Sequence, residues 1–143
     1  MAKKNLRFTE VEVSRNFPTG ISTHVDWEPR TNVVETEDGK LWIIEVELPG
    51  VDKNDISICI EESSHLVVRG IKHKPRIENC SSVTYFLFER EFGTFYKRVN
   101  IDPQVDEAHI HSSMENGVLT IRIPRKKEEP AADKPESGER IKR

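Results

Sequence analysis

The sequence has 143 residues, of which 33% are charged, and a net charge of −3 at pH 7. A chain of this length can form one domain that buries a sufficient core without a metal or a disulfide, with short tails besides. Charges of both signs are interspersed, so the chain has no overall basic field, and we expect no nucleic-acid partner.

No apolar run is long enough for the core of a signal peptide or for a membrane span. We therefore expect a soluble, cytoplasmic protein with no membrane span. In that compartment Cys59 and Cys80 are expected to be reduced thiols rather than a disulfide.

Residues 1–28 are predicted to form an N-terminal arm. Pro18 and Gly20 interrupt any long helix there. Apolar residues are scattered among polar ones, the main examples being Phe8, Val11, Val13, Phe17 and Ile21.

From residue 29 to residue 125 the pattern changes to short segments with alternating apolar and polar residues, separated by turn signals. This pattern, together with the absence of any segment with the periodicity of an amphipathic helix, predicts an all-β domain. We expect an antiparallel immunoglobulin-like β-sandwich. The mixed, polar residues 71–84 are predicted to be a long excursion. The strands before the final hairpin are predicted at 31–36, 40–48, 56–60, 65–69, 85–91 and 94–101.

A β-hairpin is predicted over residues 110–124. Asn116-Gly117 can adopt the positive φ angles of a two-residue turn. After it, Leu119, Ile121 and Ile123 alternate with polar residues, so they share one apolar face. Residues 126–143 are rich in Lys, Glu, Pro and Asp and are predicted to be a flexible polar tail.

Several ordered motifs resemble those of the small heat-shock proteins, the Hsp20 or α-crystallin-domain family, across about residues 29–125. The hairpin resembles the family signature, with Ser112 where the family usually has Ala, followed by Gly117, Val118 and Leu119. The segments 46–51, with Leu-Pro-Gly-Val, and 89–95, with Glu-Arg-x-x-Gly-x-Phe, are similar to two further family motifs.

The resemblance implies an ATP-independent holdase, which binds unfolding client proteins and suppresses their aggregation under stress. It also implies a homodimer, which in this family is often assembled into a larger homo-oligomer. The apolar arm residues Phe8, Val11, Val13, Phe17 and Ile21 are candidates for client binding, with packing on their own domain or on a partner subunit as the alternative.

The resemblance further implies strand exchange between the subunits of the dimer, unless the excursion is an ordinary surface loop. A groove that accepts a neighbour's tail is expected between the strands at 56–60 and 94–101. The exchange residues would be Thr31, Val33 and Glu35 with Ile77, Cys80 and Val83, and the groove residues Ile56, Ile58, Ile60, Phe95 and Val99.

The C-terminal end departs from the family pattern. Family members usually end in Ile-x-Ile or Ile-x-Val, whereas here Ile141 is the single tail anchor and Arg143 occupies the second position. Large assemblies linked by tails are therefore in doubt.

An enzymatic function is not expected, because no catalytic or phosphate-binding motif is present. His109 and His111 have no third ligand nearby in the sequence, so neither a metal site nor a cofactor is expected. The alternative function is a p23-like β-sandwich co-chaperone, an interaction module with one specific folded partner.

Overall fold

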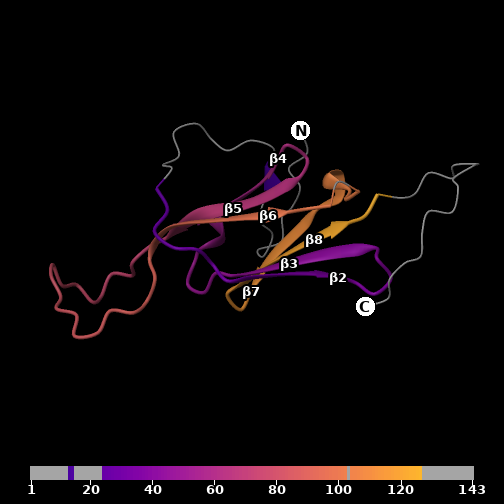
Figure 1. The fold of residues 1–143 in the computed structure, drawn as a ribbon. Coiled ribbons are helices and arrows are strands. Elements are labelled where there is room, and N and C mark those ends of the chain that lie inside the picture. Colours follow the sequence, from indigo (N-terminus) through magenta and orange to yellow (C-terminus); the bar gives the residue numbers. More distant parts are fainter. Residues whose placement is uncertain (1–12, 15–23, 103, 127–143) are drawn as a thin grey trace, which may run out of the picture.

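The computed structural model describes residues 13–14, 24–102 and 104–126. In this part of the chain eight strands form two four-stranded sheets, which appear as two layers in Figure 1. With the exception of β1, neighbouring strands are antiparallel. The predicted antiparallel β-sandwich is therefore confirmed.

One sheet has the strand order β2-β3-β8-β7. Its strands β7 and β8 form the predicted hairpin, and Asn116 and Gly117 at its turn have φ angles of 52° and 75°. This is the left-handed conformation that an Asn-Gly turn adopts readily. The strands are β2 (Thr31–Glu35), β3 (Leu41–Glu47), β7 (His111–Glu115) and β8 (Val118–Pro124).

The other sheet has the order β1-β4-β5-β6. β1 is only two residues long and pairs in parallel with β4, with Val13 opposite Ile58 and Ser14 opposite Cys59. The sequence did not predict this pairing. The strands are β1 (Val13–Ser14), β4 (Ile56–Glu61), β5 (His65–Lys72) and β6 (Gly93–Asn100).

Two short 3-10 helices begin where an aspartate can cap them. Asp52 accepts a hydrogen bond from the N–H of Asn54 at η1 (Lys53–Asp55), and Asp106 accepts one from the N–H of Ala108 at η2 (Glu107–His109). A side-chain oxygen at this position satisfies an N–H group that has no partner within the helix. The caps fix the chain where it enters β4 and β7.

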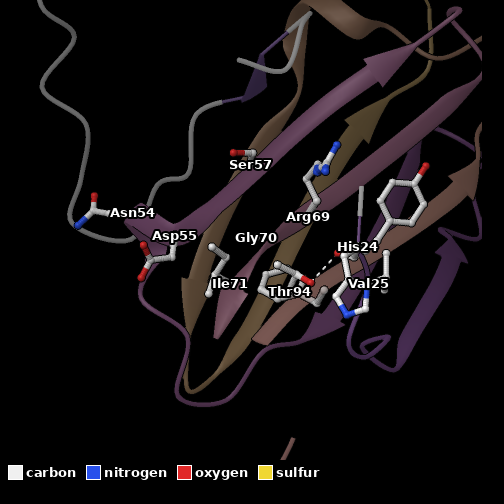
Figure 2. Close-up of a pocket in the computed structure, with 11 residues that line it drawn as sticks. His24, Val25, Asn54, Asp55, Ser57, Arg69, Gly70, Ile71 and Thr94 are labelled. Atoms are coloured by element: carbon white, nitrogen blue, oxygen red, sulfur yellow. Dashed lines mark hydrogen bonds between the residues drawn. The ribbon is translucent and has the colours of Figure 1, made fainter. Parts of the chain in front are cut away.

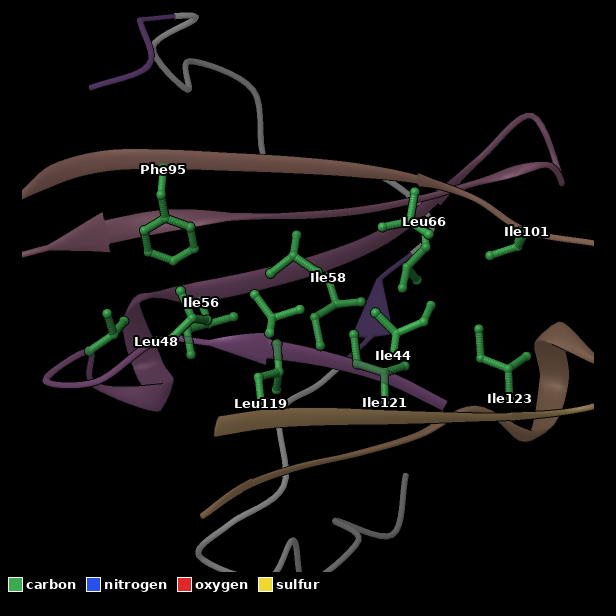
Figure 3. Packing of buried hydrophobic residues seen from close by; sticks show 14 of the residues in the cluster. Ile44, Leu48, Ile56, Ile58, Leu66, Phe95, Ile101, Leu119, Ile121 and Ile123 are labelled. Atoms are coloured by element: carbon green, nitrogen blue, oxygen red, sulfur yellow. The ribbon is translucent and has the colours of Figure 1, made fainter. Parts of the chain in front are cut away.

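The core fills the space between the two sheets. Ile44, Ile58, Leu66 and Ile121, from four different strands, are fully buried and point toward one another (Figure 3). Alternation explains this placement, since every second residue of each strand faces the opposite sheet. Leu119, Ile121 and Ile123 of the hairpin are all buried, as their pattern predicted.

The strand predicted at 85–91 is wrong. Residues 73–92 contain no strand, and Ile71 and Lys72, predicted to begin the excursion, belong to β5. The excursion, here called the β5–β6 loop, therefore covers residues 73–92. It projects away from both sheets at the left of Figure 1.

Candidate interaction surfaces

One surface is the outer edge of β2. Among the described strands β2 pairs only with β3, so its other edge is open. Thr31, Val33 and Glu35 lie along it, and the side chains of Val33 and Val34 are 43% and 45% exposed. An open strand with exposed apolar side chains can pair with another chain.

An ion cluster fixes the end of β2. The guanidinium of Arg125 lies 2.6 Å from the carboxylate of Glu35 and 2.9 Å from that of Asp102. Burial alone would lower the pKa of Arg125, but the hydrogen bond to Glu35 and the two negative charges raise it. The cluster joins the β2 edge to the segments that follow β6 and β8.

The second surface is the β5–β6 loop. The predicted exchange residues Ile77, Cys80 and Val83 lie on it and are exposed. The structure does not bring them to Thr31, Val33 and Glu35 of the same chain, because β2 has no described neighbour except β3.

The most exposed apolar residues of the loop were missed as site residues. Phe86, Leu87 and Phe88 are 97%, 72% and 53% exposed. They fall within the strand that was predicted at 85–91, and aromatic residues are indeed frequent in strands. The signal against that assignment was the unbroken apolar run, since a strand with one face in water alternates.

Aromatic contacts organise this part of the loop. The rings of Tyr85 and Phe88 meet edge to face with their centroids 4.9 Å apart. The ammonium group of Lys74 lies 4.8 Å from the centroid of Phe88 and 5.3 Å from that of Tyr85. Such contacts are favourable for both partners. They leave Phe86 and Leu87 free to contact another molecule.

Lys72 fixes the base of the loop. Its ammonium group lies 5.8 Å from the ring centroid of Trp27 and 5.7 Å from that of Phe92, and the residue is only 8% exposed. Burial, followed by the positive charge of Arg90, lowers the pKa of Lys72, and Glu91 opposes this effect. Apolar and cationic groups thus hold the ends of the loop together.

Gly93, where the loop returns to the sheet, lies against Asp26. The Asp26 carboxylate accepts hydrogen bonds from the backbone N–H and the hydroxyl of Thr94, at 2.8 and 3.1 Å. These bonds, together with one from His24, lower the pKa of Asp26. Gly93 has φ of 98°, and a Cβ there would overlap the Asp26 carboxylate. Only glycine fits this position without a shift of its neighbours.

The predicted tail groove needs correction. β4 and β6 are not neighbours, because β5 lies between them. Their inward side chains form part of the core between the sheets instead. Of the five predicted residues, Ile56, Ile58, Phe95 and Val99 are buried, and Ile60 packs at the margin of the core.

An open cavity of about 320 Å³ lies near the base of the loop, and no sequence pattern predicted it. Figure 2 shows Ser57, Arg69 and Thr94 among the side chains that line it. The Arg69 guanidinium lies 5.9 Å from the ring centroid of Tyr96. The lining mixes polar and apolar groups and belongs to the surface of the β4-β5-β6 layer.

The remaining predicted residues have different outcomes. Phe8, Val11, Phe17, Ile21 and Ile141 lie outside the described residues, and Val13 is described only as part of β1. His109 contacts the carboxylate of Asp106 at 2.7 Å.

No helix of the described residues is both long and apolar enough to cross a membrane.

The family signature packs closely within the sandwich. Ser112 is buried opposite Ile121, where a small side chain fits, and Leu119 is fully buried. The carbonyl oxygen of Gly117 accepts a hydrogen bond from the N–H of Leu48, which belongs to the Leu-Pro-Gly-Val motif. Two motifs far apart in the sequence therefore meet.

Comparisons with known proteins agree with these observations. Small heat shock protein C2 of Rickettsia felis is 34% identical over 112 residues, 78% of this chain and 70% of that protein. Small heat shock protein C4 of the same organism is 32% identical over 124 residues, 87% of this chain and 72% of that protein.

Solved structures of small heat-shock proteins share the fold. A small heat-shock protein from Xylella fastidiosa has a TM-score of 0.62 at 26% identity, covering 80% of this chain and all of that one (100%). Heat shock protein 16.0 from Schizosaccharomyces pombe has a TM-score of 0.61 at 25% identity, and the match covers 81% of this chain and 99% of that one. Residues 34–140 match the Hsp20/alpha crystallin family. The chain belongs to the Hsp20/alpha crystallin family, and its sandwich is an α-crystallin domain.

Proposed function

We propose that this protein is an ATP-independent holdase, which binds partly unfolded proteins in the cytoplasm and suppresses their aggregation under stress. The observation that carries the proposal is the family match over residues 34–140, because membership of the small heat-shock protein family supports a chaperone role in stress. The same match does not favour the p23-like alternative.

The chemistry of unfolding proteins supports this function. Such proteins expose apolar side chains and unpaired strand edges, and they aggregate through both. The arm offers apolar residues for clients, namely Phe8, Val11, Val13, Phe17 and Ile21. A rigid sandwich that presents such a segment can cover a client without consuming nucleotide.

The second part of the proposal is a homodimer formed by strand exchange. The β5–β6 loop projects from the sandwich with apolar side chains at 85–88, and the β2 edge presents unpaired backbone groups beside Val33. If the loop of one subunit lies along β2 of its partner, both features are covered at once. Backbone hydrogen bonds between the loop and β2 would supply affinity, and the apolar side chains would fix the register in which the two segments pair.

The holdase proposal is tested by light scattering of a heat-labile client at a near-equimolar subunit ratio without nucleotide. We expect suppressed scattering, whereas an equal mass of an inert protein should leave scattering unchanged. Deleting residues 1–23, which keeps Asp26 and the core residue Trp27, should remove most of the protection and leave the far-ultraviolet circular dichroism of a β-protein.

Unchanged client aggregation with the full chain would contradict the holdase function. Full protection by the truncated protein would instead contradict only the role assigned to the arm.

A further inference from the structure

The open cavity near the base of the β5–β6 loop has the outer face of the β4-β5-β6 layer as its floor. Ser57 of β4, Arg69 of β5 and Tyr96 of β6 are register partners across these three strands, and all three line the cavity. Ile71 and Thr94 form the next row of the same floor, since residues two apart along a strand share a face. Side chains from three strands therefore share one hollow.

Two short segments form the walls of this cavity. The hydroxyl of Thr94 donates a hydrogen bond of 2.6 Å to the carbonyl oxygen of His24, which holds residues 24–25 beside β6. On the side of β4, the capped helix η1 contributes Asp55. In Figure 2 Asp55 lies on one side of Ile71, and residues 24–25 lie on the other. The cavity thus has a wall on two sides of the sheet surface.

The guanidinium of Arg69 is oriented for an anion. It lies over the ring of Tyr96, 5.9 Å from the ring centroid. A guanidinium that stacks on a ring uses its face for that contact and keeps the N–H groups at its edge for other partners. These N–H groups match a carboxylate, which they can bind through two parallel hydrogen bonds. Arg69 is half-buried, so salt screens this attraction less than it would at an exposed arginine.

The rest of the lining selects an apolar body and a single negative charge. Ile71 and Val25 are exposed and give the cavity apolar surface. The carboxylate of Asp55 in the η1 wall, which lies 3.5 Å from the imidazole of His73, would repel a second negative charge on a ligand. The volume of about 320 Å³ is at the lower end of the range for ligand pockets, so the ligand must be small.

We propose that this cavity binds a small monocarboxylate with an apolar chain, of the class of the medium-chain fatty acids. The carboxylate would pair with the guanidinium of Arg69, and the chain would lie against Ile71 and Val25. The bound ligand would connect η1, the sheet and residues 24–25. Binding at this site does not depend on the proposed holdase function.

Titration calorimetry of the full chain with octanoate tests the proposal. We expect a single octanoate per subunit. Acetate has the carboxylate without the chain, and octan-1-ol has the chain without the carboxylate. Each should bind at least about tenfold more weakly than octanoate, because one loses the burial of several methylene groups and the other loses charge-assisted hydrogen bonds.

Three variants locate the site. Arg69→Met keeps an unbranched apolar side chain but removes the guanidinium, so it should weaken octanoate binding about tenfold or more. Arg98→Met is the matched control, since Arg98 lies on the same face of the sheet and does not line the cavity, and it should leave the affinity unchanged. Ile71→Ser should weaken the binding of octanoate but not that of acetate. Thermal unfolding should show that each variant remains folded.

Each result bears on the proposal. Affinity that falls in Arg69→Met and Ile71→Ser but not in Arg98→Met supports the site. Absence of octanoate binding, equal binding of octan-1-ol, or an unchanged affinity in Arg69→Met overturns it.

A further variant distinguishes the cavity from the exposed apolar side chains of the β5–β6 loop. Phe86→Ser with Leu87→Ser should bind octanoate as the wild type does, because neither residue lines the cavity. Loss of binding in this variant would assign the ligand to the loop and overturn the proposal. No client is present in these titrations, so failure of the holdase proposal would not affect them.

Discussion

The backbone N–H of Leu48 donates a hydrogen bond of 2.7 Å to the carbonyl oxygen of Gly117. This bond joins the end of β3 to the turn of the β7–β8 hairpin. At the same contact, a Cβ on Gly117 would lie 2.9 Å from the Cα of Pro49. The glycine of the family signature therefore serves both the turn and the approach of a second motif.

Gly117→Ala should lower the free energy of unfolding by about 2 kcal/mol or more, because it adds a strained φ angle and a steric overlap. Urea denaturation measures this loss. Gly39→Ala is a matched control, since Gly39 has φ of 69° with only Glu35 near its Cβ position, at 3.7 Å. It should cost about 1 kcal/mol from strain alone. Equal losses at both positions would argue against the importance of the Pro49 contact.

Ile121→Ala should destabilise the domain by about 2–5 kcal/mol, since it leaves a cavity between the two sheets. Ile121 is fully buried among residues of both sheets. The free energy of unfolding from urea denaturation checks this, and Val25→Ala, at an exposed position outside β2 and the β5–β6 loop, should change it by about 0.5 kcal/mol or less. Similar losses in both variants would be inconsistent with the described core.

Phe86→Ser with Leu87→Ser should shift the proposed dimer toward monomer, because it removes the apolar side chains that a partner would cover. Sedimentation velocity over a dilution series would measure the shift. Val25→Ser, which changes a side chain that is 46% exposed but lies outside the loop, should leave the dimer intact. An unaltered monomer fraction in the loop variant would rule out the exchange role of these two residues.

Asp26 should contribute to stability in a manner that depends on pH. Its pKa is lowered below the usual 3.8, chiefly by hydrogen bonds from Thr94, so the folded state favours the ionised form. This contribution is present above pH 3.8 and is lost as the pH falls through the lower folded-state pKa. Wild type should therefore have a higher Tm than Asp26→Asn at pH 6, and the difference should shrink as the pH falls below 3.8.

Calorimetric Tm values across this pH range check the effect. Glu37→Gln removes a negative charge from another exposed side chain and serves as the control for a change in surface charge alone. A constant difference between wild type and Asp26→Asn would mean that the carboxylate's charge is not the cause.

Local patterns in the sequence predicted much of the sandwich. The hairpin around Asn116-Gly117 is one example, because its turn chemistry and its alternating strand are both local signals. The β3 residues Ile44 and Val46 are another, since alternation alone indicates their inward face. Most strands therefore formed within a few residues of their expected ranges.

Relationships between distant strands could not be predicted in the same way. The expected groove required β4 and β6 to be neighbours, but their hydrophobic patterns carry no information about the strand between them. The pairing of β1 with β4 involves two residues, too few for any periodic signal. Phe86, Leu87 and Phe88 have the composition of a strand, and only the tertiary structure shows that no described strand of the same chain pairs with them.

The β5–β6 loop is flanked by Lys72 of β5 and Gly93 of β6, which are directly opposite each other in the ladder. A partner that pulls on the loop would therefore apply force to the end of this ladder and open its hydrogen bonds one after another, rather than shear them together. The contacts of Lys72 with Trp27 and Phe92 lie at that end and would resist the first step. Under such a pull the ladder would begin to open at the base of the loop, which is also where these contacts reinforce it.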